Sequence, residues 1–494
     1  MTEMPTNAKI ELDDFLAQRE TVFREQLGTD PYDLDECTTW AADNARRGSM
    51  SAALAQAKAG GATVVVPRAG VATMQGQREL MQQLDEAGAG VLPITIDSLT
   101  RELHFEEAAR RLAESTPEDS LLNGFPIVAH GIEATRELIS SFDKPVIIRA
   151  NAVDLRIVAE TGMASGGSSF VSGPMYATLE YSKHTTLAES IPKWQYVFRV
   201  LGHYTERGVP AGDDAVGFAQ SGTCSVPSLM IVGTVLDALI MAGQGIKHIM
   251  PYAMLQGNVA QDVACCMASE ALTQEYLQRL GFHDVSTYVA SSDWNGAFPQ
   301  QIPDAYGLIA TNIVAAAIAK APLNYVKTIE EGVGVPTAAA NAASIRITRY
   351  LFRLIGLQAE SLISPQINAE FDLIMMQGRA ILDAVLDLGG GDPVQGAIAA
   401  LQVGVLDIPF SPNVNVRGNV LPIRDATGAV RFLDHGNLPL PQEAIRIEAE
   451  YLSRRQAGGA ALSYQDMIDD LDFLELGAEG GAPPSPVPAR PGHH

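Results

Sequence analysis

The sequence is poor in positive charge and contains no long hydrophobic run. It has 34 Lys and Arg residues against 58 Asp and Glu residues, and its formal net charge is −24 at pH 7. A chain this acidic is repelled by nucleic acid and by anionic lipid, so neither is expected as its main partner. The longest apolar stretch, residues 225–243, is interrupted by Gly233 and Asp237. We therefore predict no transmembrane helix.

Cysteine is also scarce. The four cysteines are Cys37, Cys224, Cys265 and Cys266, and none of them forms a CxxC pair. This spacing argues against a disulfide framework and against a structural zinc site, and it is typical of reduced thiols. The first twenty residues are polar and acidic, unlike the apolar segment of a secretion signal. We therefore expect a cytoplasmic protein that holds no metal ion with its own side chains.

The middle of the chain alternates short apolar runs with helical stretches. Nine runs have the composition of strands: ATVVVPRAG, GVLPITID, FPIVAHG, PVIIRAN, SSFVSGP, AVGFAQSG, IKHIMPYA, VSTYVASS and NYVKTIE. This alternation predicts βαβ units around a parallel sheet, that is, an α/β fold. A TIM-type (β/α)8 barrel needs eight strands, so one of the nine runs is not a strand or lies outside the barrel.

The segments on either side of this barrel have a different pattern. Residues 1–60 are charged and amphipathic, which predicts an N-terminal helical extension to a barrel over residues 61–338. Residues 339–475 contain long helical stretches and a hairpin with the turn sequence ATG, which predicts a C-terminal region of helices and a hairpin. Residues 476–494 are rich in Pro and Gly and are predicted to be disordered.

Three arginines follow three of the predicted strands: Arg68 in VVVPRAG, Arg101 in ITIDSLTR and Arg149 in VIIRA. In one parallel barrel all three would converge at the C-terminal face, where such barrels bind ligands. A guanidinium group matches a carboxylate in two-point contact. Three fixed positive charges therefore indicate a small polyanion, most simply a dicarboxylate. The alternative is that these are three surface arginines in loops.

In their order, the motifs resemble the large (epsilon) subunit of glutamate mutase, also called methylaspartate mutase. The matching stretches are PRAGV, PITIDSLTR, LLNGFPIV, the SGP segment that ends in Tyr181, QGNVAQDVA, WNGAFP, VKTIEEGVGVPT, VLDIPFSP, LPIRDATGAVRFLDHGN and DMIDDL. The resemblance implies a TIM-type barrel capped by adenosylcobalamin. It also implies an isomerase that interconverts glutamate and 3-methylaspartate by radical rearrangement, in which the cofactor supplies the difficult chemistry.

The resemblance also implies a partner protein. Cobalamin-binding domains of this class use a DxHxxG motif, whose histidine coordinates cobalt, and this chain has none. His435, in LDHGN, is the nearest match and has the wrong spacing. We therefore expect a separate small Rossmann-like cobalamin-binding subunit. The family implies a heterotetramer that contains a homodimer of large subunits.

Several residues match functional positions of the family. Arg68, Arg101 and Arg149 match an arginine claw that grips the substrate carboxylates, and Tyr181 matches a tyrosine that contacts the substrate. The resemblance therefore gives these arginines the role that their position after the strands already indicated.

Four further residues match positions near the cofactor. Lys327 and Glu331 match polar residues near the ribose of the adenosyl group, although four-residue spacing is also that of a surface ion pair. Gly70 and Asn123 match loop positions beside the cofactor, and turn geometry alone could also explain them.

One departure from the family is pronounced. Val171 stands where the family has a glutamate that holds the substrate ammonium group, and Ala177 aligns with a tyrosine. Valine offers an ammonium group neither charge nor a hydrogen bond. Either the substrate lacks the amine, or Tyr176 and Glu180 compensate. The DWNGAFP segment is altered as well, at Asp293 and Asn295.

Three functions therefore remain open. The chain is the large subunit of a mutase that acts on glutamate or a related dicarboxylate, or it uses the same radical machinery on a different 2-oxo, hydroxy or non-proteinogenic amino acid. The third alternative is a non-catalytic protein that binds dicarboxylates.

Overall fold

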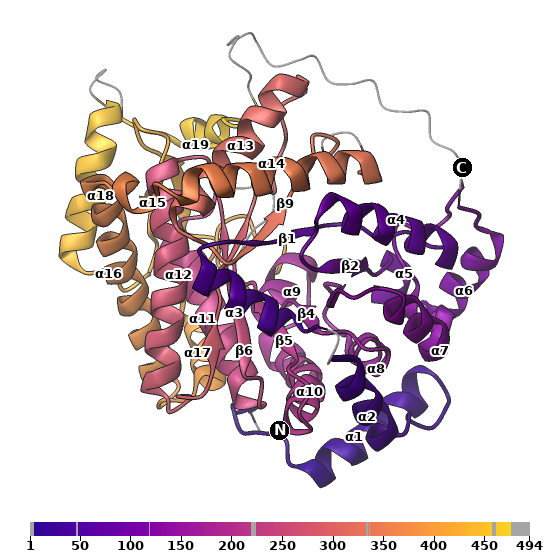
Figure 1. Cartoon of the computed structure of the whole chain (residues 1–494). Helices are drawn as coiled ribbons and strands as arrows, with labels where there is room; N and C mark the ends of the chain where they lie inside the picture. The colour runs from indigo at the N-terminus through magenta and orange to yellow at the C-terminus, as the bar shows by residue number, and fades with distance from the viewer. Residues whose placement is uncertain are drawn as a thin grey trace, which may run out of the picture.

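The computed structural model describes residues 4–45, 48–117, 119–218, 224–331, 334, 336–456 and 461–475. Its centre is a ring of short parallel strands surrounded by helices (Figure 1). The ring consists of β1 (Val64–Pro67), β2 (Leu92–Thr95), β3 (Val146–Arg149), β4 (Ser169–Val171), β5 (Gly212–Ala215), β6 (His248–Met254), β8 (Ala290–Ser292) and β9 (Leu323–Val326). Most of these strands are rich in Val, Ile and Leu, which suit a sheet that is buried on both faces.

The strand order shows that the ring is a barrel. The order is β1-β9-β8-β6-β5-β4-β3-β2, and every ladder in it is parallel. β1 and β2 meet through two backbone hydrogen bonds, from Gly90 N to Val65 O (3.0 Å) and from Thr95 N to Ala69 O (3.2 Å). A further strand, β7 (Ser286–Thr287), pairs with the start of β6 and lies off this path. The predicted TIM-type barrel is therefore confirmed.

Two of the nine predicted strands were placed wrongly. The run FPIVAHG is not a strand: only an isolated bridge joins Phe125 to Ile96, and helix α7 (Ile127–Ser140) begins two residues later. The run AVGFAQSG holds only the last residue of β5, because that strand is the polar segment GDDA. Residues 219–222 of this run lie outside the described residues.

Helices surround the barrel and form most of the connections between its strands. They are α4 (Met74–Ala87), α5 (Ser98–Arg101), α6 (Phe105–Glu114), α7, α8 (Arg156–Ala164), α9 (Pro174–Tyr181), α10 (Leu187–Glu206), α11 (Pro227–Gly243), α12 (Val259–Arg279), α13 (Ile302–Ile318) and α14 (Ala338–Gly356). α11 is apolar and buried along its length, because more helices pack on its outer side.

Those outer helices belong to the C-terminal region, on the left of Figure 1. It consists of α15 (Ala359–Leu362), α16 (Pro365–Leu388), α17 (Pro393–Val403), the antiparallel hairpin of β10 (Leu421–Arg424) and β11 (Val430–Asp434), α18 (Gln442–Arg455) and α19 (Tyr464–Leu471). α16 packs against α11 and α12, and α17 packs against α11. The ATG turn predicted from the sequence joins β10 and β11. The tail predicted to be disordered, residues 476–494, lies outside the described residues.

At the other end of the chain, three helices precede the barrel: α1 (Leu12–Gln26), α2 (Leu34–Ala45) and α3 (Met50–Gly60). A buried ion pair fixes α1 to α8, with Arg19 Nε 2.8 Å from Glu160 Oε1, and Tyr196 of α10 donates a hydrogen bond to the same oxygen. All four cysteines are free thiols. Within the described residues, every helix is too short or too polar to cross a membrane.

Candidate active site

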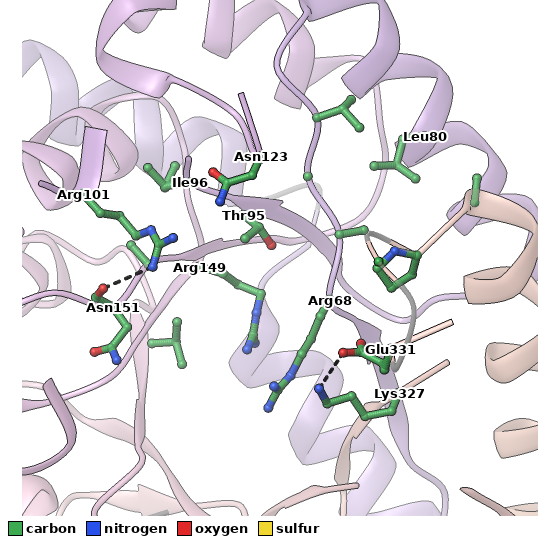
Figure 2. A pocket seen from close by; sticks show the side chains of 18 of the residues that line it. Arg68, Leu80, Thr95, Ile96, Arg101, Asn123, Arg149, Asn151, Lys327 and Glu331 are labelled. Carbon is green, nitrogen blue, oxygen red and sulfur yellow. Dashed lines mark hydrogen bonds and ion pairs between the residues drawn. The ribbon is translucent and has the colours of Figure 1, made fainter. Parts of the chain in front are cut away.

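A cavity of about 590 Å³ opens at the C-terminal ends of the barrel strands. All nine residues selected from the sequence line it: Arg68, Gly70, Arg101, Asn123, Arg149, Val171, Tyr181, Lys327 and Glu331. They come from loops and strand ends far apart in the sequence, and the barrel brings these ends to one face. Figure 2 shows the three arginines extending toward this cavity from separate segments.

Arg68 directly follows β1 and lies at the cavity wall. Its Nη2 donates hydrogen bonds to the Tyr252 hydroxyl (2.7 Å) and to Ser292 Oγ (3.1 Å). Its buried Nε has no hydrogen-bond partner among the described residues. Two neutral hydroxyl groups fix the side chain without neutralising it, so the positive charge stays available to an anion in the cavity.

Arg149 is the last residue of β3. Its guanidinium lies over the Tyr325 ring, 4.4 Å from the centroid, and the aromatic face holds the cation in place. The buried Nη1 finds no acceptor within the described part of the chain. Buried polar groups normally have hydrogen-bond partners, and an unpaired donor on a cation is therefore a place where an anionic ligand fits.

Arg101 ends the short helix α5 on another side of the cavity. Its Nη1 donates to the backbone oxygen of Asn151, 3.4 Å away (Figure 2). Asn151 is itself held by Ser172, whose hydroxyl donates to Asn151 Oδ1 at 2.6 Å. Ser172 has φ of 104°, a conformation that is strained for a residue other than glycine. Strain of this kind is often found where the surrounding structure holds a functional site in place.

Lys327 and Glu331 form an ion pair inside the cavity. Lys327 Nζ lies 2.7 Å from Glu331 Oε2, and Lys327 is only 8% exposed. Burial, together with the charge of Arg68, lowers the pKa of Lys327 to about 8. The alternative of an ordinary surface pair is therefore wrong, because both groups line the cavity next to an arginine.

Val171 is the last residue of β4 and is 7% exposed. Tyr181 lies at the rim, and its hydroxyl is 3.1 Å from that of Tyr176, which also lines the cavity. Ala177 is fully buried, and neither it nor Glu180 belongs to the described residues that line the cavity. Of the two residues expected to compensate for Val171, only Tyr176 is therefore in place to do so.

The comparisons with known proteins agree with this geometry. A family model described as methylaspartate mutase E chain (MutE) matches residues 45–480. The glutamate mutase epsilon subunit of Desulfitobacterium hafniense (strain Y51) is 37% identical over 483 residues, which cover 97% of this chain and 99% of that protein. The glutamate mutase epsilon subunit of Halobacterium salinarum is 38% identical over 426 residues, 85% of this chain and 88% of that protein. This chain belongs to the methylaspartate mutase E chain family.

Membership in the methylaspartate mutase E chain family supports the prediction that this chain is the large subunit of a mutase. Mutases are isomerases. Among solved structures, a DAHP synthase from Thermotoga maritima aligns with 60% of this chain and 70% of its own, with 14% identity and a TM-score of 0.34. The barrel assignment rests on the strand order and not on that weak likeness.

Two of the selected residues have structural roles in this family member. A Cβ at Gly70 would lie 2.5 Å from the backbone oxygen of Thr95, so only glycine fits there. Asn123 Oδ1 accepts a hydrogen bond from the backbone N–H of Ser98, the first residue of α5. Turn geometry and close packing therefore account for both residues, whatever else they contact.

Two buried acids, Asp214 and Asp293, lie beside the cavity. The sequence contained no indication of Asp214, and it marked Asp293 only as an altered position. Asp214, in β5, is fully buried; burial raises its pKa to about 7, against the opposing effects of Tyr325, Arg149 and Arg68. Asp293 accepts a hydrogen bond from Lys327 N at 3.0 Å, and burial raises its pKa to about 7 as well. The sequence alone does not reveal Asp214, because the segment GDDA lacks the apolar pattern that predicts a strand. Its place in the barrel is known only from the structure.

Proposed function

We propose that this chain is the catalytic large subunit of an adenosylcobalamin-dependent carbon-skeleton mutase. In this proposal it interconverts glutamate and 3-methylaspartate, or a related pair of dicarboxylates. One observation carries the proposal: Arg68, Arg101 and Arg149 reach one cavity, and two of them have buried donor nitrogens without a partner among the described residues. Two carboxylates of a small diacid would satisfy three guanidinium groups.

The arginines would fix the substrate, not react with it. Charge-assisted hydrogen bonds from Arg68 and Arg149 would hold the carboxylates, and Arg101, positioned by Asn151 and Ser172, would complete the grip. Fixing both ends of a small diacid leaves its central carbons in one defined place. Such orientation lowers the entropic part of the barrier, because the reacting atoms no longer have to find one another.

Lys327 and Glu331 fit the adenosyl group of the cofactor. They present a hydrogen-bond donor and an acceptor next to each other at the cavity wall, which matches two neighbouring ribose hydroxyl groups. When bound, adenosylcobalamin supplies the radical that removes a hydrogen atom from the substrate. The protein side chains around it would exclude water and other reactants from the cavity.

The cobalt ligand would come from a partner. The chain lacks the DxHxxG motif, whose histidine coordinates cobalt in cobalamin-binding domains of this class. We therefore assign the cobalamin to a small Rossmann-like subunit docked over the open C-terminal face of the barrel. The proposed assembly is a heterotetramer of two large and two small subunits, with the large subunits as a homodimer.

A second candidate is a mutase of the same kind with a different substrate. Val171 favours it, because this apolar side chain lines the cavity between charged neighbours. A non-catalytic binding protein is less well supported. Glu331 argues against it, because a carboxylate in the cavity lining repels a diacid and is not needed to grip one.

The test is reconstitution. The purified chain is mixed with the small subunit of the same organism, adenosylcobalamin and a panel of dicarboxylates, and products are identified by mass spectrometry. Electron paramagnetic resonance follows radical formation. We expect substrate-dependent radical and an isomerised product only when both subunits are present. A complex that binds cobalamin but forms neither radical nor product with any dicarboxylate would overturn the proposal.

A further inference from the structure

One row of aligned residues crosses four neighbouring strands beneath the cavity. Thr95 of β2 pairs with Arg149 of β3, and Val171 of β4 pairs with Asp214 of β5. Between these pairs, the register of Ile147 with Ser169 places Arg149 beside Val171. Aligned residues of parallel strands point to the same face, so Val171 lies between Arg149 and Asp214 on the inner face of the barrel.

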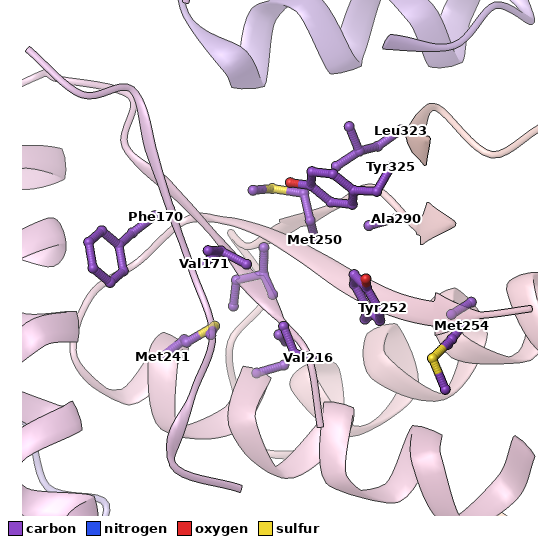
Figure 3. Close-up of a cluster of buried hydrophobic side chains, with 14 of the residues drawn as sticks. Phe170, Val171, Val216, Met241, Met250, Tyr252, Met254, Ala290, Leu323 and Tyr325 are labelled. Atoms are coloured by element: carbon purple, nitrogen blue, oxygen red, sulfur yellow. The ribbon is translucent and has the colours of Figure 1, made fainter. Parts of the chain in front are cut away.

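The close-up view agrees with this placement. Figure 3 shows Val171 near Val216 and on the side of β4 away from Phe170, as the alternation of a strand requires. Val216, which follows β5, also lines the cavity and is 4% exposed. Two apolar side chains, Val171 and Val216, therefore lie in the cavity wall on this side of Arg149.

The charges of the cavity are unbalanced. Among the described residues that line it, the cations are Arg68, Arg101, Arg149 and Lys327, and the acids are Glu79 and Glu331. Glu331 is already paired with Lys327. Glu79 is exposed on α4, where it accepts a hydrogen bond from Gln75. Glu331 is therefore already neutralised, and the charge of Glu79 is screened by solvent, so neither offers a buried counter-charge to a cationic group beside Val171.

Asp214 is the nearest acid in the row, and it is covered. It is 0% exposed and does not belong to the described lining of the cavity. Burial raises its pKa to about 7, so the carboxyl group is only partly ionised near neutral pH. An ammonium group at Val171 would thus lie beside two valines and the positive charge of Arg149, and no unpaired buried acid among the described lining residues would offset its desolvation and the repulsion.

We propose that this cavity selects small dicarboxylates that carry no ammonium group, and that an uncharged part of the substrate contacts Val171 and Val216. This inference rests on the proposed mutase function and narrows its substrate class. A methylene, methyl, hydroxyl or keto group fits beside the valines, and the three arginines still hold both carboxylates. The reaction stays an isomerisation, in which substrate and product have the same atoms and the same oxidation level overall.

The test compares ligands that share one carbon skeleton. The complex of both subunits with adenosylcobalamin is titrated calorimetrically with glutarate, 2-oxoglutarate, L-2-hydroxyglutarate and L-glutamate, and radical and product are followed for each. We expect at least one amine-free diacid to bind about 100-fold more tightly than L-glutamate, since an unpaired buried charge is costly. Binding of L-glutamate equal to or tighter than that of every amine-free diacid would overturn the inference.

Two substitutions sharpen the test. Val171→Glu should raise the affinity for L-glutamate relative to glutarate by about tenfold or more, and Val171→Met, of similar length but uncharged, should keep the original preference. Because a glutamate here lies beside Asp214 and could impair folding, Asp214→Asn is the second variant. It should also keep the preference; a selective loss of L-glutamate binding would identify Asp214 as the partner of the amine and overturn the inference.

The two proposals fail differently. Efficient turnover of L-glutamate with no preference for amine-free diacids would overturn the substrate class and support the mutase function. Absence of radical with every ligand would overturn the mutase function, and the calorimetric ranking would still decide the substrate class.

Discussion

Arg149 combines a fixed position with an unused donor. Its guanidinium is held over Tyr325, and its buried Nη1 meets no acceptor among the described residues. Arg149→Lys keeps the charge but loses the planar two-point contact, because an ammonium group is a point charge. We expect the affinity for the preferred diacid to fall by about 2 kcal/mol, roughly 30-fold. Calorimetry on the complex checks this.

Arg110→Lys is the matched control for that substitution. Arg110 lies on α6, exposed, and pairs with Glu107 and Glu114 on its own helix. Diacid affinity should therefore be unchanged. If Arg149→Lys binds the diacid as tightly as this control does, Arg149 does not contact a carboxylate.

The charge of Lys327 should make diacid binding depend on pH. Burial and Arg68 lower the pKa of Lys327 to about 8, so the ligand-free cavity loses one positive charge as pH rises through that value. The arginines stay charged. We expect the dissociation constant for the diacid to increase by about tenfold between pH 7 and pH 9. Lys327→Met should bind more weakly at pH 7, with a flatter profile over the same range; an equally steep profile in this variant would exclude Lys327 as the titrating group.

Several residues around the cavity could be found from the sequence and others could not. Arg68, Arg101 and Arg149 could be found because each lies at the end of a strand or shortly after it, and strand ends of a parallel barrel converge. Ser172 carries no signal, since its positive φ is imposed by the fold and not by its side chain. Asp214 was missed because a strand that contains two acids breaks every apolar pattern.

At the scale of elements, a buried charge cluster attaches the C-terminal hairpin to α16, an outer helix that packs against α11 and α12. Arg431 of β11 pairs with Glu370 of α16 and with Asp425 in the turn, and all three side chains are 1% exposed. Arg431→Met removes the only cation of this cluster and leaves two buried acids uncompensated. We expect the free energy of unfolding to fall by about 3–5 kcal/mol, measured by denaturant titration.

An exposed pair on the neighbouring helix provides the control for this substitution. Arg446 and Glu450 of α18 are paired, and each side chain is 63% exposed. Arg446→Ala should change the free energy of unfolding by less than about 0.5 kcal/mol, because solvent screens such pairs. Similar losses in Arg446→Ala and Arg431→Met would mean that the buried cluster does not stabilise the hairpin.

The two misplaced strands show where reading elements from sequence fails. FPIVAHG has three apolar residues in a row after Pro126, and a run this short is compatible with a buried strand or with the start of a buried helix. Tertiary contacts decide between the two, and here they produced α7. GDDA became a strand because the barrel buries its backbone between β4 and β6, which satisfies the peptide groups whatever the side chains are.

At the scale of the whole molecule, the formal net charge of −24 conceals how the charges are arranged. Four cationic side chains among the described residues line the cavity, and several acidic side chains are buried in the barrel strands and in the helices around them. Burial is the largest cause that raises the pKa to about 7 in five carboxyl groups, those of Asp214, Asp237, Asp262, Asp293 and Glu448. Each of them binds a proton in the folded protein that the unfolded chain has already lost at pH 5 to 7.

This arrangement sets the sign of the pH dependence of stability. A carboxyl group whose folded pKa is raised contributes stability that is fully present below its unfolded pKa, about 4, and lost as pH rises through its folded pKa, about 7. Carboxylates with a lowered pKa, such as Glu36 beside Arg136, have the opposite effect: the stability that they contribute is lost as pH falls below about 5. Burial is the main cause that lowers the pKa values of His130, His203 and His248. Their contribution to the free energy of unfolding therefore rises between about pH 5 and 7, opposite to that of the buried acids.

Asp237 allows the contribution of a single buried acid to the pH dependence of stability to be measured, because burial raises its pKa to about 7. Asp237 accepts hydrogen bonds from Met175 N (3.1 Å) and Gly217 N (3.2 Å), so Asp237→Asn keeps one acceptor and removes the titration. We expect the free energy of unfolding of the wild type to fall more steeply between pH 5 and pH 7 than that of this variant, by up to about 1.4 kcal/mol per pH unit. Asp284→Asn, at an exposed pair with Lys247, should match the wild-type slope in that window, because its pKa is lowered. Equal slopes for wild type and Asp237→Asn would show that Asp237 is already ionised in the folded protein at pH 5.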